Sequence, residues 1–287
     1  MDILKIDLAD YRKSGAGANG ESYDCIADDT VMLKLYNKDY HTDTIFKELE
    51  VARKAYDFGI PSPKPGEAVT DGERMGIRFH RIIGKRSFSR MLADEPERYD
   101  ELTREFARSC LKIHSMECPD GLFPDAKLQF QALLDADVYL DARQKAKAAA
   151  FLKNIPDSKT ALHGDMHIGN LISTLPFGAP LSHPHDLYFI DLGYFARGCP
   201  LLDIGMMRCV CITSDEEFRQ KEMHINASLA AKVWATFVDE YFCGRLTVEE
   251  ADDLIIPYQA LKCFLVEYNL NGVLPQTFEE LVKSVDW

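Results

Sequence analysis

The segment L-H-G-D-M-H-I-G-N, residues 162–170, contains the residue types best suited to chemistry. A carboxylate, Asp165, and an amide, Asn170, stand five residues apart, and the same segment contains two histidines and two glycines. Transfer of a phosphoryl group to a hydroxyl needs a carboxylate to accept the hydroxyl proton and oxygen ligands for Mg²⁺. Asp165 can supply the first, Asn170 is a candidate for the second, and Asp191 follows in Y-F-I-D-L-G as a further carboxylate. The spacing therefore predicts a phosphoryl-transfer site.

The two histidines of this segment leave a metal site and a plain polar turn as alternatives. His163 and His167 are four residues apart, but Gly164 argues against a helix that would align their rings, and no third ligand is evident. The run H-P-H-D at 183–186 is interpreted as an exposed loop on the same ligand count. We expect His163 to brace the loop.

A glycine-rich segment, S-G-A-G-A-N-G at 14–20, contains the pattern G-x-G-x-x-G as Gly15, Gly17 and Gly20. A dinucleotide fold would need an apolar strand before it and a helix after it, and a P-loop would end in G-K-[ST]. Neither context is present, whereas strand-like residues follow the glycines. This context favours a strand–loop–strand flap over the phosphates of a nucleotide. A flexible turn without a function is the alternative.

Lys34 lies in the apolar run V-M-L-K-L-Y, where a lysine is either an edge residue facing solvent or a functional cation. The functional alternative needs an acidic partner on a nearby helix, and Glu48 and Glu50 follow by 14 and 16 residues. We predict that Glu48 is the partner and that the pair presents a positive charge to the α- and β-phosphates.

The order of patterns predicts a two-lobed α+β fold. Residues 1–84 are strand-rich, with hairpin signals at Asp28-Asp29 and Asp71-Gly72 and one helix over 43–58 that Gly59 should end. Residues 85–287 are mainly helical, with long periodic segments over 96–116 and 128–154. We therefore predict a nucleotide-binding lobe followed by a helical lobe that holds the catalytic loop and the acceptor site.

The formal net charge of −13 makes nucleic acid an improbable partner, because an acidic surface repels polyphosphate. Eight scattered cysteines without a C-x-x-C pair suggest reduced thiols and a cytoplasmic location. No uncharged apolar run approaches the roughly 20 residues that span a bilayer, so no membrane association is expected.

Together these residues resemble the aminoglycoside phosphotransferase and choline kinase superfamily, whose members have a protein-kinase-like fold. H-G-D-M-H-I-G-N followed by I-D-L-G is similar to the family's catalytic and metal motifs. G-A-G-A-N-G, V-M-L-K, K-E-L-E-V-A-R, G-I-P-S-P-K, R-I-I-G-K-R and G-C-P-L-L-D-I-G occur in the family's order. The resemblance covers roughly residues 14–210.

The resemblance implies a role for each of these residues. Asp165 would be the catalytic base, and Asn170 and Asp191 would be Mg²⁺ ligands. Lys34, braced by Glu48, would hold the phosphates under the loop of Gly15, Gly17 and Gly20. The linker at His80 and Ile82 would present backbone groups to the purine, and Asp203 would be a structural carboxylate.

The implied activity is a kinase that uses ATP, or alternatively GTP, and Mg²⁺ to phosphorylate a hydroxyl of an aminoglycoside-, choline- or sugar-like small molecule. A protein Ser/Thr kinase and a nucleotide-binding regulatory pseudokinase are the alternatives. Only 12 residues separate Asp191 from Asp203, which disfavours a long activation loop and a peptide substrate. The gap between Asn170 and Asp191 is 21 residues, and the sequence assigns no role to its insertion, residues 173–187.

Overall fold

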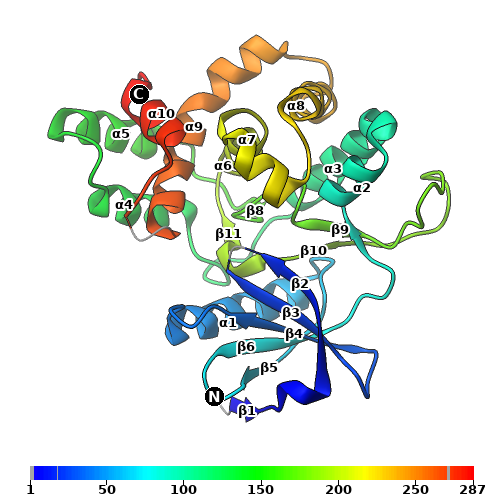
Figure 1. The fold of residues 1–287 in the computed structure, drawn as a ribbon. Helices are drawn as coiled ribbons and strands as arrows, with labels where there is room; N and C mark the ends of the chain where they lie inside the picture. The colour runs from blue at the N-terminus through cyan, green and yellow to red at the C-terminus, as the bar shows by residue number, and fades with distance from the viewer. Residues whose placement is uncertain (1–2, 18, 270–271) are drawn as a thin grey trace. The chain divides into compact units, whose positions relative to one another are not determined.

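The computed structural model describes residues 3–17, 19–269 and 272–287, and the chain divides into two units (Figure 1). The first comprises Met1–Ser87 and Asn170–Tyr194, and the second comprises Phe88–Gly169 and Phe195–Trp287. Strands dominate the first unit and helices the second, so the predicted α+β class is confirmed. That Gly84 separates two domains stays a prediction.

The first unit is built on a six-stranded sheet in the order β1-β5-β6-β4-β3-β2. Both predicted hairpin turns are present, one between β3 and β4 and one between β5 and β6. In the first turn the Asp28 carboxylate accepts the backbone N–H of Thr30, and in the second Gly72 adopts a positive φ of 99°. The elements before residue 88 are β1 (Ile3–Lys5), η1 (Leu8–Asp10), β2 (Tyr11–Gly17), β3 (Gly20–Cys25), β4 (Val31–Tyr36), α1 (Thr42–Phe58), β5 (Pro65–Thr70), β6 (Met75–His80) and β7 (Arg86–Ser87).

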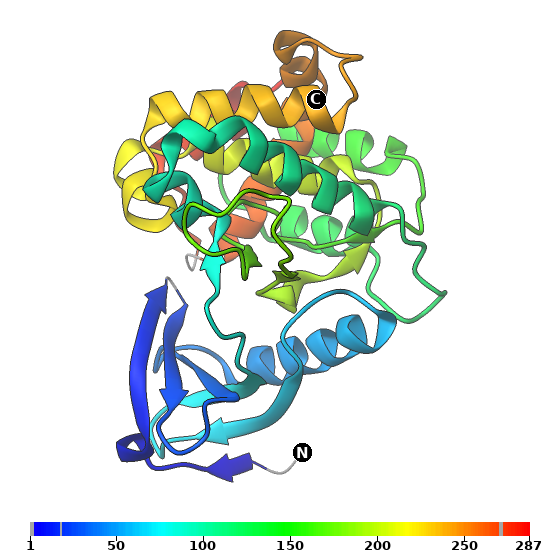
Figure 2. The ribbon, with the colours of Figure 1, turned by 90° about the vertical axis from the view of Figure 1, so that its right-hand side faces the viewer.

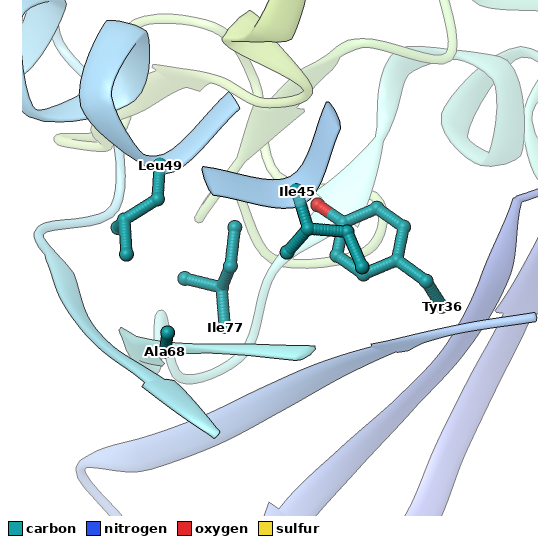
Figure 3. Packing of buried hydrophobic residues seen from close by; sticks show 5 residues of the cluster. All are labelled: Tyr36, Ile45, Leu49, Ala68 and Ile77. Atoms are coloured by element: carbon teal, nitrogen blue, oxygen red, sulfur yellow. The ribbon is translucent and has the colours of Figure 1, made fainter. Parts of the chain in front are cut away.

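Helix α1 covers one face of this sheet. Its apolar stripe buries Ile45 and Leu49 completely against Tyr36, Ala68 and Ile77 of the strands, as Figure 3 shows. Burying side chains of this size stabilises a fold by roughly 1.5–3 kcal/mol each. The helix ends where the sequence predicts, because the residue after Phe58 is a glycine in the left-handed conformation. This packing fixes the helix that carries Glu48.

The chain returns to the first unit as a second, three-stranded sheet in the order β10-β9-β7. Its strands β9 (Leu171–Ser173) and β10 (Leu187–Phe189) form a hairpin, followed by the 3₁₀ turn η3 (Leu192–Tyr194). The insertion at 173–187 is thus the loop of this hairpin together with its adjoining strand residues.

The second unit is a helical assembly with one two-stranded sheet, β8 (Ala161–Leu162) paired with β11 (Ala196–Arg197). Helix α3 packs along α8 (Figure 2). Phe106 of α3 contacts both Phe88 and Phe237 through its ring. The helical elements are α2 (Phe88–Asp94), η2 (Pro96–Arg98), α3 (Tyr99–His114), α4 (Ala126–Ala136), α5 (Ala142–Asn154), α6 (Leu201–Arg208), the π-helical turn η4 (Cys209–Thr213), α7 (Glu216–Phe218), the π-helical turn η5 (Arg219–Met223), α8 (Ala227–Tyr241), α9 (Val248–Asn269) and α10 (Gln276–Ser284). None of the helices in the described ranges is sufficiently long and apolar to cross a membrane.

The periodic segment 128–154 is interrupted, and the interruption buries a carboxylate. Asp137 ends α4 and accepts the backbone N–H groups of Tyr139 and Leu140, while Asp141 begins α5 with a capping box. The side chain of Asp137 lies beside Glu267 of α9, and these two residues are 4% and 5% exposed. Burial, followed by the neighbouring carboxylate, raises the pKa of Glu267 to about 7.

The buried carboxyl pair predicts a pH-dependent stability. The pKa of Glu267 is higher in the folded protein than its ordinary 4.5. The stabilisation that the protonated Glu267 gives the folded state is therefore complete below about pH 4.5 and is lost as the pH rises through about 7. We expect the free energy of unfolding, measured in urea, to fall between pH 5 and pH 8 more in the wild type than in Glu267→Gln. The exposed Glu249→Gln on the same helix should behave as wild type, and a pH dependence that Glu267→Gln leaves intact would contradict this assignment.

Candidate active site

The glycine-rich segment forms the turn of a hairpin between β2 and β3. Gly15 and Gly17 lie in β2 and Gly20 begins β3, while residue 18 lies outside the described residues. A Cβ at Gly20 would sit 2.1 Å from the carbonyl oxygen of Leu35, so only glycine lets β3 approach β4 this closely. The strand–loop–strand arrangement expected for this segment is present.

Lys34 of β4 is held between two carboxylates of the first unit. Its Nζ lies 2.9 Å from Oε1 of Glu48 and 2.5 Å from Oδ1 of Asp191. Burial lowers the pKa of Lys34, but Asp191 and Glu48 outweigh it and hold the pKa well above its ordinary value. Glu50 instead pairs with Lys54 along the helix surface. Lys34 is therefore a fixed positive charge and not a solvent-facing edge residue.

The β9–β10 hairpin brings Asn170 and Asp191 to the same place. Leu171 pairs with Phe189, and the next residues outward are joined by a 3.0 Å hydrogen bond from Ile190 N to Asn170 O. Asp191 follows directly, with φ at 58°, a left-handed conformation that is uncommon outside glycine. The 21-residue gap is thus closed by strand pairing, and the two residues present carboxylate and amide oxygens, the donor type that Mg²⁺ prefers.

Gly193 lets the segment after Asp191 lie against α1. A Cβ at this position would be 2.8 Å from Cγ and 3.2 Å from Oε2 of Glu48. No role for this glycine was predicted from the sequence, although it is the last residue of the motif I-D-L-G. A larger residue would push against the carboxylate that holds Lys34.

In the linker predicted to contact a purine, two backbone N–H groups already donate hydrogen bonds within the protein. The backbone N–H of His80 donates to Lys64 O at 2.9 Å, and that of Arg81 donates to Thr30 O at 2.7 Å. A contact with a base from this linker would therefore have to use carbonyl oxygens or the backbone of Ile82.

In the second unit, the loop carrying Asp165 is anchored on Asp203 of α6. This carboxylate is completely buried, and its two oxygens accept the backbone N–H groups of His163 at 2.7 Å and Gly164 at 2.9 Å. Burial raises the pKa of Asp203, but a hydrogen bond from His114 and the charge of Lys262 outweigh it and leave the pKa below its usual range. The structural role expected for Asp203 is confirmed.

The histidines of the loop hold backbone groups. Nδ1 of His163 accepts the N–H of Asp165 at 3.2 Å, and Nδ1 of His167 accepts the N–H of Gly169 at 3.1 Å. His163 is fully buried, which confirms its bracing role. Across the described ranges 3–17, 19–269 and 272–287, no group of three His, Cys, Asp or Glu side chains is arranged to hold a metal ion.

Asp165 itself is 28% exposed by its side chain, so it is accessible but not freely solvated. Burial raises the pKa of Asp165, but the neighbouring His167, with smaller contributions from His163 and Lys262, outweighs it and holds the pKa well below its ordinary value. The carboxylate is therefore ionised at neutral pH and able to accept a hydrogen bond from a hydroxyl.

Two residues that support this loop were missed in the sequence analysis. Lys262 of α9 is 2% exposed and donates from Nζ to Gly164 O at 2.6 Å, with Asp203 Oδ1 at 4.0 Å. His114 contacts Asp203 through Nε2 at 3.2 Å and the Tyr241 hydroxyl through Nδ1 at 2.7 Å. The signal for Lys262 was a lone lysine in the apolar run A-L-K-C-F-L, the same signal that identified Lys34.

Removing the buried carboxylate should cost far more stability than removing an exposed one. In Asp203→Ala two backbone N–H groups lose their acceptor and the Lys262 ammonium loses its nearby negative charge in a buried site, and we expect a loss of about 3–5 kcal/mol in urea unfolding. Asp239→Ala, which breaks a surface ion pair with Arg104, should change stability by about 0.5 kcal/mol or less. Equal losses for the two variants would refute the anchoring role.

One comparison with known proteins shows the family, and another shows the fold. The model of the phosphotransferase enzyme family, APH, matches residues 10–235. Among solved structures, aminoglycoside-3′-phosphotransferase of type VIII is 17% identical with a TM-score of 0.61, over 89% of this chain and 94% of that chain.

Two further solved structures share this fold. A thermostable mutant of aminoglycoside phosphotransferase APH(4)-Ia, in ternary complex with ADP and hygromycin B, is 13% identical with a TM-score of 0.59, over 97% and 95% of the two chains. APH(3″)-Id from Streptomyces rimosus, in complex with ADP and streptomycin, is 15% identical with a TM-score of 0.51, over 87% and 91%. No curated protein matches the sequence. The structural likenesses show the predicted kinase-like fold, and the family match, which spans most of the sequence, shows that the chain belongs to the phosphotransferase enzyme family.

Proposed function

We propose that the protein transfers the γ-phosphoryl group of ATP to a hydroxyl of a small molecule in a Mg²⁺-dependent reaction. The observation that carries this proposal is the contact of Lys34 with both Glu48 and Asp191 in the first unit. A magnesium–nucleotide complex contains phosphate anions that a fixed ammonium attracts and a cation that a carboxylate attracts. The ADP complexes of the structural neighbours support the choice of a nucleotide.

Lys34 supplies a positive charge at the phosphates, and Glu48 holds its side chain in place. Asn170 and Asp191 would hold Mg²⁺, which when bound neutralises charge on the phosphates. A site with two protein ligands suits this ion, since Mg²⁺ keeps several waters and shares phosphate oxygens. Asp165 accepts the proton of the attacking hydroxyl, and the low pKa of this carboxyl keeps it ionised to do so.

The acceptor is proposed to be a small molecule and not a polypeptide. Between Asp191 and Asp203 the chain is occupied by η3, by β11 and by the start of α6, so no long activation segment interrupts it. The protein Ser/Thr kinase and pseudokinase alternatives lack a supporting observation of this kind. The aminoglycoside, amino-alcohol or sugar nature of the acceptor, the use of GTP, and the cytoplasmic location stay predictions.

Nucleotide binding is the first prediction of this proposal. A ligand that binds only the folded state stabilises it by about 2.7 kcal/mol at a concentration 100 times its Kd, so saturating Mg·ATP should raise the wild-type melting temperature by about 5 °C. In Asp191→Ala the Mg²⁺-dependent part of this rise should disappear, whereas the exposed Asp186→Ala of the same hairpin should keep it. GTP in place of ATP tests the purine preference. A wild type that does not respond to either nucleotide would remove the proposal.

The Lys34 ion pair gives a matched pair of variants. Glu48→Gln and Glu50→Gln are two residues apart on α1, but only Glu48 contacts Lys34. We expect Glu48→Gln to weaken Mg·ATP binding, measured by titration calorimetry, by about tenfold or more, since the neutral amide lacks the charge that holds the Lys34 ammonium in place. Glu50→Gln should bind as wild type, and a similar loss in both variants would contradict the assignment.

Asp165 should be needed for turnover and not for nucleotide binding. Asp165→Asn removes the proton acceptor, and we expect phosphoryl transfer to fall by roughly 10²–10⁴-fold while the Mg·ATP-induced thermal shift persists. The exposed Asp157→Asn is the control. Labelled ATP offered with a mixture of metabolites or with polypeptides separates a small-molecule kinase from a protein kinase, because label on polypeptide alone would favour the latter.

A further inference from the structure

His167 is held through both ring nitrogens, in a way that the proposed mechanism leaves unused. Nδ1 accepts the backbone N–H of Gly169 at 3.1 Å, and Nε2 lies 3.7 Å from Oδ2 of Asp165. All three residues belong to the same loop of the second unit, and the His167 side chain is only 13% exposed. The ring thus connects a fixed backbone group to the carboxylate of the proposed base.

The backbone contact determines which nitrogen carries the proton. A nitrogen that accepts a hydrogen bond uses its lone pair for it, so the proton of the neutral ring is on the other nitrogen. In His167 this places the N–H on Nε2, the atom that faces Asp165. The ring is therefore a directed donor to the carboxylate.

The surroundings allow the ring to lie in this position. A Cβ on Gly169 would be 2.9 Å from Cε1 and 3.0 Å from Nδ1 of His167, so a glycine is required where the ring folds back on the chain. The methyl group of Met223 lies 3.5 Å from the same Cβ position and closes the other side of Gly169. The loop is built around the imidazole.

We propose that His167 is the positioning residue that orients the Asp165 carboxylate for proton transfer. Its Nε2 faces Oδ2 across 3.7 Å, and the Nε2–H···Oδ2 hydrogen bond forms when this separation shortens in the substrate complex. The inference rests on the proposed function, in which Asp165 accepts the proton of the acceptor hydroxyl. His163 has a different task, because its Nδ1 holds the backbone N–H of Asp165 and not the carboxylate. Once Oδ2 accepts this hydrogen bond, the rotation of the carboxylate about its last side-chain bond is restricted, so that its orientation is set before the proton is transferred.

Substitution of His167 by glutamine or by asparagine distinguishes the donor function of Nε2–H from the acceptor function of Nδ1. In His167→Gln the side-chain N–H₂ can take the place of Nε2–H, whereas in His167→Asn the shorter amide oxygen can only replace Nδ1 as acceptor of Gly169 N–H. His167→Ala removes both, Asp165→Ala defines the background, and His183→Gln, in an exposed loop, is the histidine control. The assay is Mg·ATP hydrolysis with water as the acceptor, which yields kcat and the KM for ATP without knowledge of the natural substrate.

We expect His167→Gln to retain kcat within about threefold of wild type, and His167→Asn and His167→Ala to lose roughly 10- to 100-fold, the effect of one hydrogen bond to a charged group. The KM for ATP should stay unchanged, because the interaction acts on the proton acceptor. Wild-type rates in all three variants, or a rate that Asn preserves and Gln does not, would overturn the inference. A wild type without Asp165-dependent hydrolysis would instead count against the proposed function.

A spectroscopic measurement does not depend on turnover. In ¹⁵N-histidine-labelled protein, the His167 ring, assigned by its loss in His167→Gln, should carry its proton on Nε2 and show an accepting Nδ1. The opposite tautomer would overturn the inference whether or not the hydrolysis of ATP can be measured.

Discussion

A carboxylate without exposed surface, Asp203, is the constraint on which the position of the loop that carries Asp165 depends. An isolated charge in such a site would be very costly, and the cost is offset here by backbone N–H groups of the loop, by His114 and by the Lys262 ammonium. Because the loop supplies two of these donors, any movement of His163 or Gly164 would leave the charge unsatisfied. The position of the loop backbone is therefore determined by a solvation requirement and not by apolar packing alone.

The first unit also contains a largely buried charge, but here the charge is positive. Lys34 is a largely buried ammonium, and it is stabilised by Glu48 from the packed face of α1 and by Asp191 from the end of β10. Three segments that are distant in the sequence are thus drawn to one cation. In each unit a partly or fully buried charge has its partners inside that unit, so the groups proposed to bind the nucleotide and the proposed proton acceptor are each oriented by local interactions.

Much of this could be predicted from the sequence, because the features concerned are local or carry a charge in an unusual context. The hairpins follow from turn residues, α1 follows from its periodicity and Gly59, and Lys34 was conspicuous as a lysine inside an apolar strand. The prediction of Glu48 and not Glu50 as the partner of Lys34 agrees with the ion pairs in the structure. Residues two positions apart on a helix point in different directions. The fold class also followed from the order of strand-rich and helix-rich segments.

What the sequence could not predict depends on contacts between distant segments. The role of Gly193 requires knowing that η3 lies on α1, and the role of Lys262 requires knowing that α9 passes behind the catalytic loop. The helical period of 128–154 concealed the break at Asp137, because a carboxylate that caps a helix end by accepting backbone N–H groups has the same sequence pattern as a solvated one. Its burial became evident only from its contact with Glu267.

The difference between apolar packing and buried charge explains how a fold can be shared with the aminoglycoside phosphotransferases at 13–17% sequence identity. Apolar core positions accept many side chains of suitable volume, so packing alone allows the sequence to diverge. A buried charge accepts few substitutions, because removing one partner leaves the other unsolvated. The loop anchored by Asp203 and the lysine held by Glu48 are constraints of the second kind.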